Sequence, residues 1–345
     1  MARQMKLFLI RHGETVDNVA QVYAGSRDSA LTNHGYQQAT RLGLHFNALG
    51  LCFTHIYSSH LQRAAKTAGL IREAQTRPLL YEGAATVVPD IVQLPVLMER
   101  DFGFYEGKKW YEKPLESKVG SEQSLEHKKA VGFVDIESKD SMAQRVDAFL
   151  DGHLLPLLDT LTGSTDQAVA VVSHGIILSV LWKRLLLRLP PKSVSFSPEL
   201  SVAPRVSLEH LGAWSNTGYL ELHMKLSTQT PNTTQNPLES TVSVNTISQN
   251  DNATVVIRHL NAQQITQSDA DTKEQDRSDA SIQHTASATQ APSSKLAPEW
   301  TAVIQTVNGK AHLKGLKRTR GGVGSARHDA SQKSIDGFFK RQKIG

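Results

Sequence analysis

The sequence predicts an α/β fold, a three-layer α/β/α sandwich with a mostly parallel central sheet. The evidence is a pattern that recurs three times: a short apolar run, polar or basic residues at its end, and then a segment with helical spacing. Residues 168–172, for example, are apolar throughout, as in strands that are covered on both faces. Repeated units of a strand and a helix favour parallel strands with helices on both sides of the sheet.

The first unit begins with the apolar run of residues 7–10, which predicts a buried strand. Arg11 and His12 follow at its carboxyl end, where open α/β sheets bind their ligands. A basic side chain beside an imidazole suits a group that attacks phosphorus next to one that neutralises phosphate oxygens. A helix at 36–49 is expected next, with Thr32 as its N-cap.

The second and third units end in the same kinds of residue. The strand predicted at 53–58 runs into a helix that has Arg63 in its first turns. The strand predicted at 168–172 is followed by His174 and by an apolar helix at 176–189. Basic or imidazole side chains thus follow all three predicted strands.

Weaker signals complete the predicted domain. A strand is expected at 79–88, a loop at 97–107 and an amphipathic helix at 141–158. The apolar patterns at 216–226 and at 300–307 predict two further strands.

The polar composition of residues 227–297 sets this stretch apart. It is rich in Thr, Ser, Gln, Asn and Asp, and no aromatic residue occurs between Tyr219 and Trp300. Such a stretch cannot offset the entropy of folding by burying apolar surface. We therefore predict a disordered insertion between two neighbouring strands, within which residues 253–257 could pair at a sheet edge. The predicted domain spans residues 1–316 around this insertion.

The net charge of +5 comes from the end of the chain. Residues 310–345 hold ten Lys or Arg against two Asp, a local charge of +8, which leaves −3 for the rest. We predict a basic, disordered tail at 317–345, and we expect direct nucleic-acid binding to be at most weak and confined to this tail.

The single cysteine, Cys52, excludes an intramolecular disulfide and favours a reducing compartment. No signal-peptide pattern precedes the first predicted strand, and no run of about 18 apolar residues occurs. We therefore expect no membrane association and place the protein in the cytoplasm, the nucleus or both.

Five short motifs are spread over the predicted domain: the stretches 9–15, 24–39 and 58–64, Glu99 with Phe102-Gly103, and Ser173-His174-Gly175. Each motif is weak alone, but their residue types and their order resemble the histidine phosphatase superfamily, in its phosphoglycerate-mutase-like branch. The resemblance implies the fold of phosphoglycerate mutase. It also implies transfer of a phosphoryl group through a phosphorylated histidine.

The matched residues have chemistry that suits this reaction. A neutral ring nitrogen of His12 can attack phosphorus and become phosphorylated. Arg11, Arg63 and His174 are expected to bind the three equatorial oxygens, whose charge the transition state must disperse. Because these three groups neutralise the phosphate, neither a metal nor another cofactor is expected.

A general acid must protonate the leaving oxygen, and Glu99 is the candidate, with Asp101 and Glu106 as alternatives. Asn18 and Gly25 are expected to line the substrate mouth. The loops that build this mouth are 16–29, 100–135 and 190–215. Surface, capping or packing roles are assigned to six further residues: His34, His45, His55, His60, Trp182 and Trp214.

Three functions occur among proteins of this kind. A phosphomonoesterase passes the phosphoryl group to water, and a mutase returns it to a second hydroxyl of a sugar acid. Some eukaryotic relatives serve as non-catalytic subunits of transcription assemblies. The mutase branch usually carries a Phe-Thr-Gly-Trp type segment where this chain has Tyr23-Ala24-Gly25-Ser26. We therefore favour a phosphatase with a small phosphorylated substrate, ahead of a non-catalytic or dual-role nuclear subunit and ahead of a mutase.

The tail carries two further signals. The basic cluster at 315–320 is of the kind that nuclear import receptors or phosphate backbones bind. Gln332, Ile335, Phe338 and Phe339 resemble the PCNA-interacting peptide, in which one helical turn presents an aliphatic and two aromatic side chains to a groove. We therefore expect PCNA, a DNA clamp, and an import receptor as partners.

Overall fold

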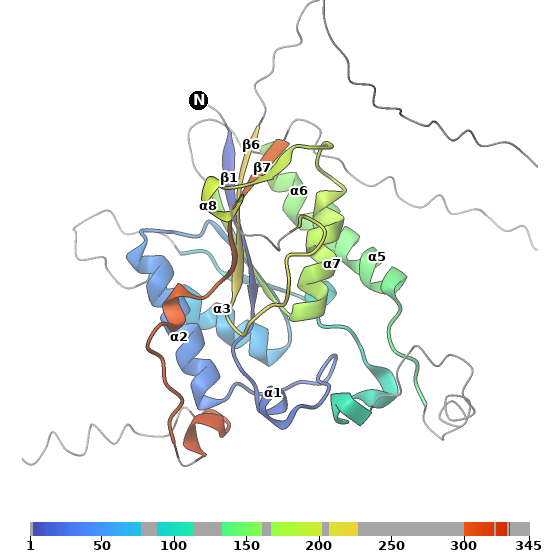
Figure 1. Cartoon of the computed structure of the whole chain (residues 1–345), viewed down its shortest axis with the longest axis vertical. Coiled ribbons are helices and arrows are strands. Elements are labelled where there is room, and N and C mark those ends of the chain that lie inside the picture. Colours follow the sequence, from blue (N-terminus) through green and yellow to red (C-terminus); the bar gives the residue numbers. More distant parts are fainter. Residues whose placement is uncertain are drawn as a thin grey trace, which may run out of the picture. The chain divides into compact units, whose positions relative to one another are not determined.

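The computed structural model describes residues 3–76, 88–112, 133–160, 167–201, 207–226, 300–320, 322–329 and 331, all within the structural unit Met1–Thr228 with Ser293–Gly345. Within these residues a seven-stranded sheet has the order β3-β2-β4-β1-β6-β7-β5 (Figure 1). Its strands are β1 (Gln4–Arg11), β2 (His55–Ser59), β3 (Ile91–Leu94), β4 (Gln167–Ser173), β5 (Val194–Phe196), β6 (Tyr219–Leu226) and β7 (Trp300–Gly309). Among these strands only β6 runs antiparallel to its neighbours, so the predicted mostly parallel sheet is confirmed.

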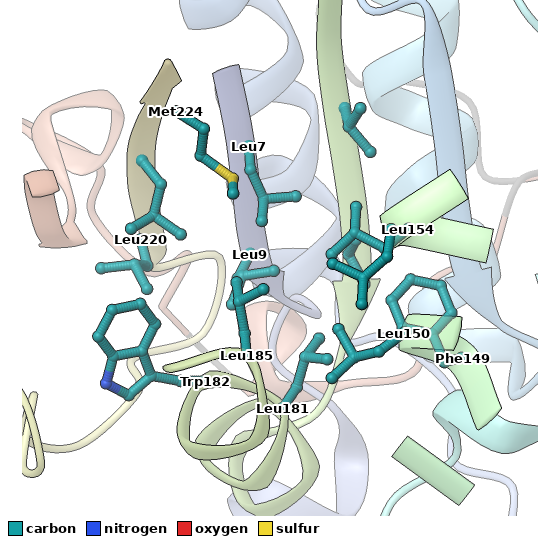
Figure 2. Packing of buried hydrophobic residues seen from close by; sticks show 14 of the residues in the cluster. Leu7, Leu9, Phe149, Leu150, Leu154, Leu181, Trp182, Leu185, Leu220 and Met224 are labelled. Carbon is teal, nitrogen blue, oxygen red and sulfur yellow. The ribbon is translucent and has the colours of Figure 1, made fainter. Parts of the chain in front are cut away.

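Helices cover both faces of this sheet (Figure 1). The described α-helices are α1 (Val16–Ala20), α2 (Asn33–Ala48), α3 (Gln62–Gln75), α5 (Lys139–Phe149), α6 (Leu155–Thr160), α7 (Gly175–Leu186) and α8 (Pro198–Ser201). Phe8 and Ile10 of β1 pack in one core with α2 and α3. Leu7 and Leu9 pack in the other core with α5 and α7, and Figure 2 shows them within this cluster. Alternate residues of β1 thus join opposite helical layers, and the predicted three-layer sandwich is confirmed.

Short turns connect these elements. The 3-10 turns are η1 (Pro95–Leu97), η2 (Gly103–Tyr105), η3 (Trp110–Glu112), η6 (Ala311–Leu313) and η7 (Val323–Ser325), and η5 (Leu150–Leu154) is a π-helical turn. The single helix predicted at 141–158 is instead α5, η5 and α6, because Pro156 has no N–H to continue the α-helical hydrogen bonds. Thr32 caps α2 as predicted, since its Oγ1 accepts the N–H of Gly35 at 2.9 Å. No helix in the described ranges has the length and apolar character needed to cross a membrane.

The last two strands of the chain frame the predicted insertion. β6 and β7 pair antiparallel with Leu226 opposite Trp300, so the chain leaves and re-enters the sheet at neighbouring positions. The strands predicted at 216–226 and 300–307 are confirmed by this pairing. The insertion predicted at 227–297, its strand at 253–257 and all but the last residue of the strand predicted at 79–88 lie outside the described residues.

Residues 310–320 and 322–329, named here the C-terminal strap, run along α2 (Figure 1). Asn33 donates its backbone N–H to the Ala326 carbonyl at 3.0 Å, and the ring of His328 stacks on Tyr36 with centroids 3.7 Å apart. These contacts hold part of the stretch after residue 316 against α2. The basic composition of this stretch could not predict backbone and ring contacts of this kind. The tail motif at 332–339 lies outside the described residues.

Candidate active site

The residues at the carboxyl ends of β1 and β4 lie together. The two strands are parallel neighbours with Arg11 opposite Ser173, and the N–H of His12 donates to the Ser173 carbonyl at 3.0 Å. His174 follows as the N-cap residue of α7. This pairing brings the ring centroids of His12 and His174 to 5.0 Å from each other. Arg11, His12 and His174 thus share one edge of the sheet.

His12 has one ring nitrogen available as a nucleophile. Its side chain is buried, and Nδ1 lies 2.7 Å from the Gly13 carbonyl oxygen. Because a carbonyl oxygen only accepts, Nδ1 carries the ring proton and Nε2 keeps a lone pair. Burial, together with the charges of Arg63 and Arg11, holds the pKa of His12 well below its ordinary value. The ring is therefore neutral near pH 7.

His174 has the opposite tautomer. Its Nδ1 accepts the Nε–H of Arg63 at 3.1 Å, which leaves the proton of the neutral ring on Nε2. Burial and then the Arg63 charge hold the pKa of His174 well below its ordinary value. Nε2 is buried and has no hydrogen-bond partner in the described part of the chain. A buried donor left in this way is costly, so the Nε2–H is suited to bind an anionic oxygen.

The two arginines of the site differ in the donors they keep. Arg11 donates from Nη1 to the Trp214 carbonyl at 2.6 Å, and its buried Nε has no partner among the described residues. Arg63 donates from Nε to His174 and from Nη1 and Nη2 to three carbonyls of the loop 24–27 at 2.8–2.9 Å. Four of the five N–H groups of Arg63 are thus in use. Arg63 supports His174 and the loop, and it keeps one N–H group for a further partner.

Of the three carboxylates considered for the acid, only Glu99 lines the cavity at this edge of the sheet. Its oxygens accept three backbone N–H groups at 2.9–3.1 Å, two of them from the first turn of α7. Glu106 instead binds the backbone N–H groups of residues 25–26 and of Phe102 at 2.9–3.1 Å. Asp101 accepts a backbone N–H two residues further on. All three carboxylates thus accept backbone N–H groups, and only the position of Glu99 in the cavity wall keeps it as the candidate acid.

Asn18 lines the cavity, whereas Gly25, also expected there, does not. The Oδ1 of Asn18 accepts from Asn216 Nδ2 at 3.1 Å. A Cβ at Gly25 would come 1.9 Å from the Arg100 carbonyl oxygen, so only glycine fits where this loop packs against that segment. Gly25 thus holds this loop against the Arg100 segment, and its neighbour Ala24 lines the cavity.

The cavity measures about 540 Å³, and much of its wall is apolar. This wall consists of Val22, Tyr23, Ala24, Phe102, Trp110, Ile176, Ala213 and Trp214. Trp214, expected to be a packing residue, therefore faces the site, while Trp182 is buried in the core as expected. The sequence could have predicted that Trp110 and Trp214 line a site. Each lies in a segment without helix or strand periodicity, where a large ring has no core to fill.

The four histidines that were expected to have surface or capping roles lie outside the cavity. They are His34, His45, His55 and His60. Across the described ranges, no three His, Cys, Asp or Glu side chains are grouped so that they could hold a metal ion.

Known proteins resemble this chain in sequence. The family model described as histidine phosphatase superfamily (branch 1) matches residues 7–197. The probable phosphoglycerate mutase GpmB of Erwinia tasmaniensis is 34% identical over 188 residues, which cover 53% of this chain and 75% of that protein. A probable phosphatase of Schizosaccharomyces pombe is 32% identical over 181 residues, 52% of this chain and 56% of that protein.

Solved structures of similar fold include a mycobacterial glucosyl-3-phosphoglycerate phosphatase. It covers 65% of this chain and 91% of its own, with 22% sequence identity and a TM-score of 0.44. The phosphoglycerate mutase of Bacillus anthracis covers 64% of this chain and 88% of its own, with 19% identity and a TM-score of 0.43. With its family match over more than half of its length, this chain belongs to the histidine phosphatase superfamily and is an enzyme of the phosphatase or mutase type.

Proposed function

We propose that this chain is a metal-independent phosphomonoesterase that hydrolyses a small phosphorylated substrate through a phosphohistidine on His12. The observation that carries the proposal is the pair of tautomers in the site. His12 offers a lone pair on Nε2, and His174 offers a buried Nε2–H without a partner among the described residues. A neutral nucleophile beside an unpaired donor suits the transfer of a phosphoryl group.

In the first step, Nε2 of His12 attacks the phosphorus atom while the bond from phosphorus to the leaving oxygen breaks. The Nε–H of Arg11, the Nε2–H of His174 and the remaining N–H of Arg63 bind the equatorial oxygens. Glu99 gives its proton to the leaving oxygen, so the product departs as a neutral alcohol.

In the second step, water replaces the alcohol. Glu99, now a carboxylate, takes a proton from the water as its oxygen attacks phosphorus. The bond from phosphorus to Nε2 of His12 breaks, and its electron pair returns to the ring. Inorganic phosphate leaves, and both side chains are back in their starting states.

The charges of the cavity favour a phosphatase over a mutase. A mutase that acts on a phosphorylated sugar acid must also hold a carboxylate, which calls for a second cationic contact. Among the described lining residues, the only arginine or lysine side chains are Arg11 and Arg63. Both lie at the phosphate end beside His12, so water is favoured as the phosphoryl acceptor.

Hydrolysis of p-nitrophenyl phosphate by the full chain tests the proposal. We expect turnover that His12→Ala abolishes and that His60→Ala, a change at an exposed histidine outside the cavity, leaves intact. Alkaline quenching with a radiolabelled phosphoester should trap an acid-labile phosphoenzyme in the wild type and none in His12→Ala. If the wild type turns over no faster than His12→Ala, catalysis is refuted, and a non-catalytic interaction subunit of a nuclear assembly becomes the better proposal.

A further inference from the structure

We propose that the apolar wall of the cavity is a subsite for the leaving group and that it selects phosphomonoesters of uncharged, apolar alcohols, with an aromatic ring as the best fit. This inference rests on the phosphomonoesterase activity proposed above. The cavity volume of about 540 Å³ lies in the range of small-molecule pockets, roughly 300–1,000 Å³. A phosphoryl group fills only a small part of it, so most of the space belongs to the rest of the ester.

The wall begins next to the phosphate. Trp214 accepts a hydrogen bond from Nη1 of Arg11 through its carbonyl oxygen at 2.6 Å, which fixes its position beside a phosphate-binding side chain. Its indole N–H donates to Oγ of Ser179 at 3.0 Å. Because the polar atom of the indole is already satisfied, the ring offers apolar surface to whatever is attached to the phosphorus.

A second set of rings comes from other segments. The rings of Tyr23 and Phe102 have centroids 4.4 Å apart, and the hydroxyl of Tyr23 donates to the Trp110 carbonyl at 3.3 Å. Trp110 is 53% exposed although it lines the cavity. An exposed indole at the mouth of a pocket loses contact with water when an apolar ligand covers it, and this favours binding.

The same wall disfavours a second charge. The nearest lysines on the segment of Trp110 are engaged elsewhere, since Nζ of Lys108 lies 2.9 Å from the centre of the Phe104 ring and Nζ of Lys109 donates to the Ala20 carbonyl at 2.6 Å. A carboxylate or second phosphate on the alcohol would lose its water there without gaining a cation, because the only lysine or arginine side chains among the described lining residues, Arg11 and Arg63, lie at the phosphate end.

Two hydroxyl groups in the lining already take part in hydrogen bonds within the protein. Oγ of Ser179 donates to the Gly175 carbonyl at 3.0 Å and accepts from Trp214, and Oγ1 of Thr15 accepts the backbone N–H of Asn18 at 3.2 Å. A sugar with several hydroxyls would therefore find few hydrogen-bond partners in this lining, whereas an alkyl or aryl group needs none. The chemistry of the lining thus points to apolar alcohols.

Three esters separate this preference from intrinsic reactivity. The alcohols released from 2-phenylethyl phosphate and ethyl phosphate have similar acidity, so their difference in kcat/KM reports binding of the ring in the transition state. We expect the wild-type kcat/KM for 2-phenylethyl phosphate to exceed those for ethyl phosphate and 3-phosphoglycerate by about tenfold or more.

Variants at the rim locate the subsite. Trp110→Ala should lower the kcat/KM ratio of 2-phenylethyl over ethyl phosphate at least about fivefold. Tyr111→Ala, at the neighbouring exposed ring that does not line the cavity, should leave this ratio unchanged. Trp110→Lys should shift the preference towards 3-phosphoglycerate, because it adds the missing cation.

The outcomes distinguish the two proposals. Turnover that depends on His12 but favours ethyl phosphate or 3-phosphoglycerate overturns the apolar subsite and leaves the phosphomonoesterase intact. A substrate ratio that Trp110→Ala does not move overturns the placement of the subsite at this wall. No His12-dependent turnover of any of the three esters overturns the phosphomonoesterase proposal itself.

Discussion

His312, in the C-terminal strap, is buried in its neutral form, which predicts a loss of stability at acid pH. Its Nε2 lies 2.9 Å from Oγ1 of Thr217, and that hydroxyl gives its own proton to the Asn216 carbonyl at 2.7 Å. The hydroxyl therefore accepts from Nε2–H, and a second ring proton must go to Nδ1. Nδ1 is buried and has no hydrogen-bond partner in the described residues, so protonation would create a buried and unpaired N–H on a cation.

The size of the effect follows from the pKa of this ring. Burial, then the charges of His45 and Arg41 on α2, lower the pKa of His312 to about 4. Tyr219 of β6 also faces the ring, with centroids 6.3 Å apart. The unfolded chain binds a proton at His312 near pH 6.5 and the folded chain only near pH 4, so falling pH favours unfolding across that interval. At about 1.4 kcal/mol per pKa unit, His312 alone removes about 2 kcal/mol between pH 7.5 and pH 5.

Urea unfolding of the full chain and of His312→Gln at four pH values from 7.5 to 5 measures this effect. Because glutamine binds no proton, the stability difference between the two proteins should change by about 2 kcal/mol over that range, in the direction that weakens the wild type at low pH. His60→Gln, at an exposed histidine, should show no such change. Parallel stability curves for the wild type and His312→Gln would refute the reasoning.

Three further predictions concern the strap, the site and the tail. Arg318→Ala removes both hydrogen bonds from this guanidinium to the nearly buried carboxylate of Glu14. Because the side chain of Arg318 is 40% exposed, we expect the free energy of unfolding in urea to fall by only about 1–2 kcal/mol. Arg320→Ala should leave the free energy of unfolding unchanged. Arg63→Lys keeps the charge, but a lysine cannot donate to three carbonyls and His174 at once. We therefore expect kcat/KM to fall about 100-fold or more, and the melting temperature of the variant shows whether it still folds. An unchanged kcat/KM would contradict this role. Calorimetry should detect heat when the full chain is mixed with PCNA and none with Phe338→Ala, whereas no heat with the wild type would exclude the clamp as a partner.

The edge of the sheet that holds the candidate site could be predicted because its residues lie within two positions of the end of an apolar run. Arg11, His12 and His174 need only the parallel pairing of β1 and β4 to meet, and the strand–helix repeat already implies parallel strands. Thr32 could be identified as an N-cap from its residue type and its place before a helical pattern. In both cases the signal is local, and the fold merely brings the local signals together.

Contacts between backbone groups of distant segments could not be predicted. Gly25 meets the Arg100 carbonyl, and Arg63 binds the carbonyls of the loop 24–27, only after separate segments have packed. Every residue has a carbonyl, so no residue type marks the ones that will be used. In the sequence, Arg318 is likewise only one member of a basic cluster, and its hydrogen bond to Glu14 is seen only in the structure.

Arg63 links the parts of the site that the sequence shows only separately. By donating Nε–H to Nδ1 of His174, it fixes which nitrogen of that ring keeps the proton, just as the Gly13 carbonyl does for His12. The two rings therefore hold a lone pair and a donor before any substrate enters, and no proton has to move between them when phosphate binds. Such preorganisation lowers the reorganisation that the transition state would otherwise require. In the proposed mechanism, Arg63 would act on the reaction mostly through His174 and the loop, and to a smaller extent through its one remaining donor.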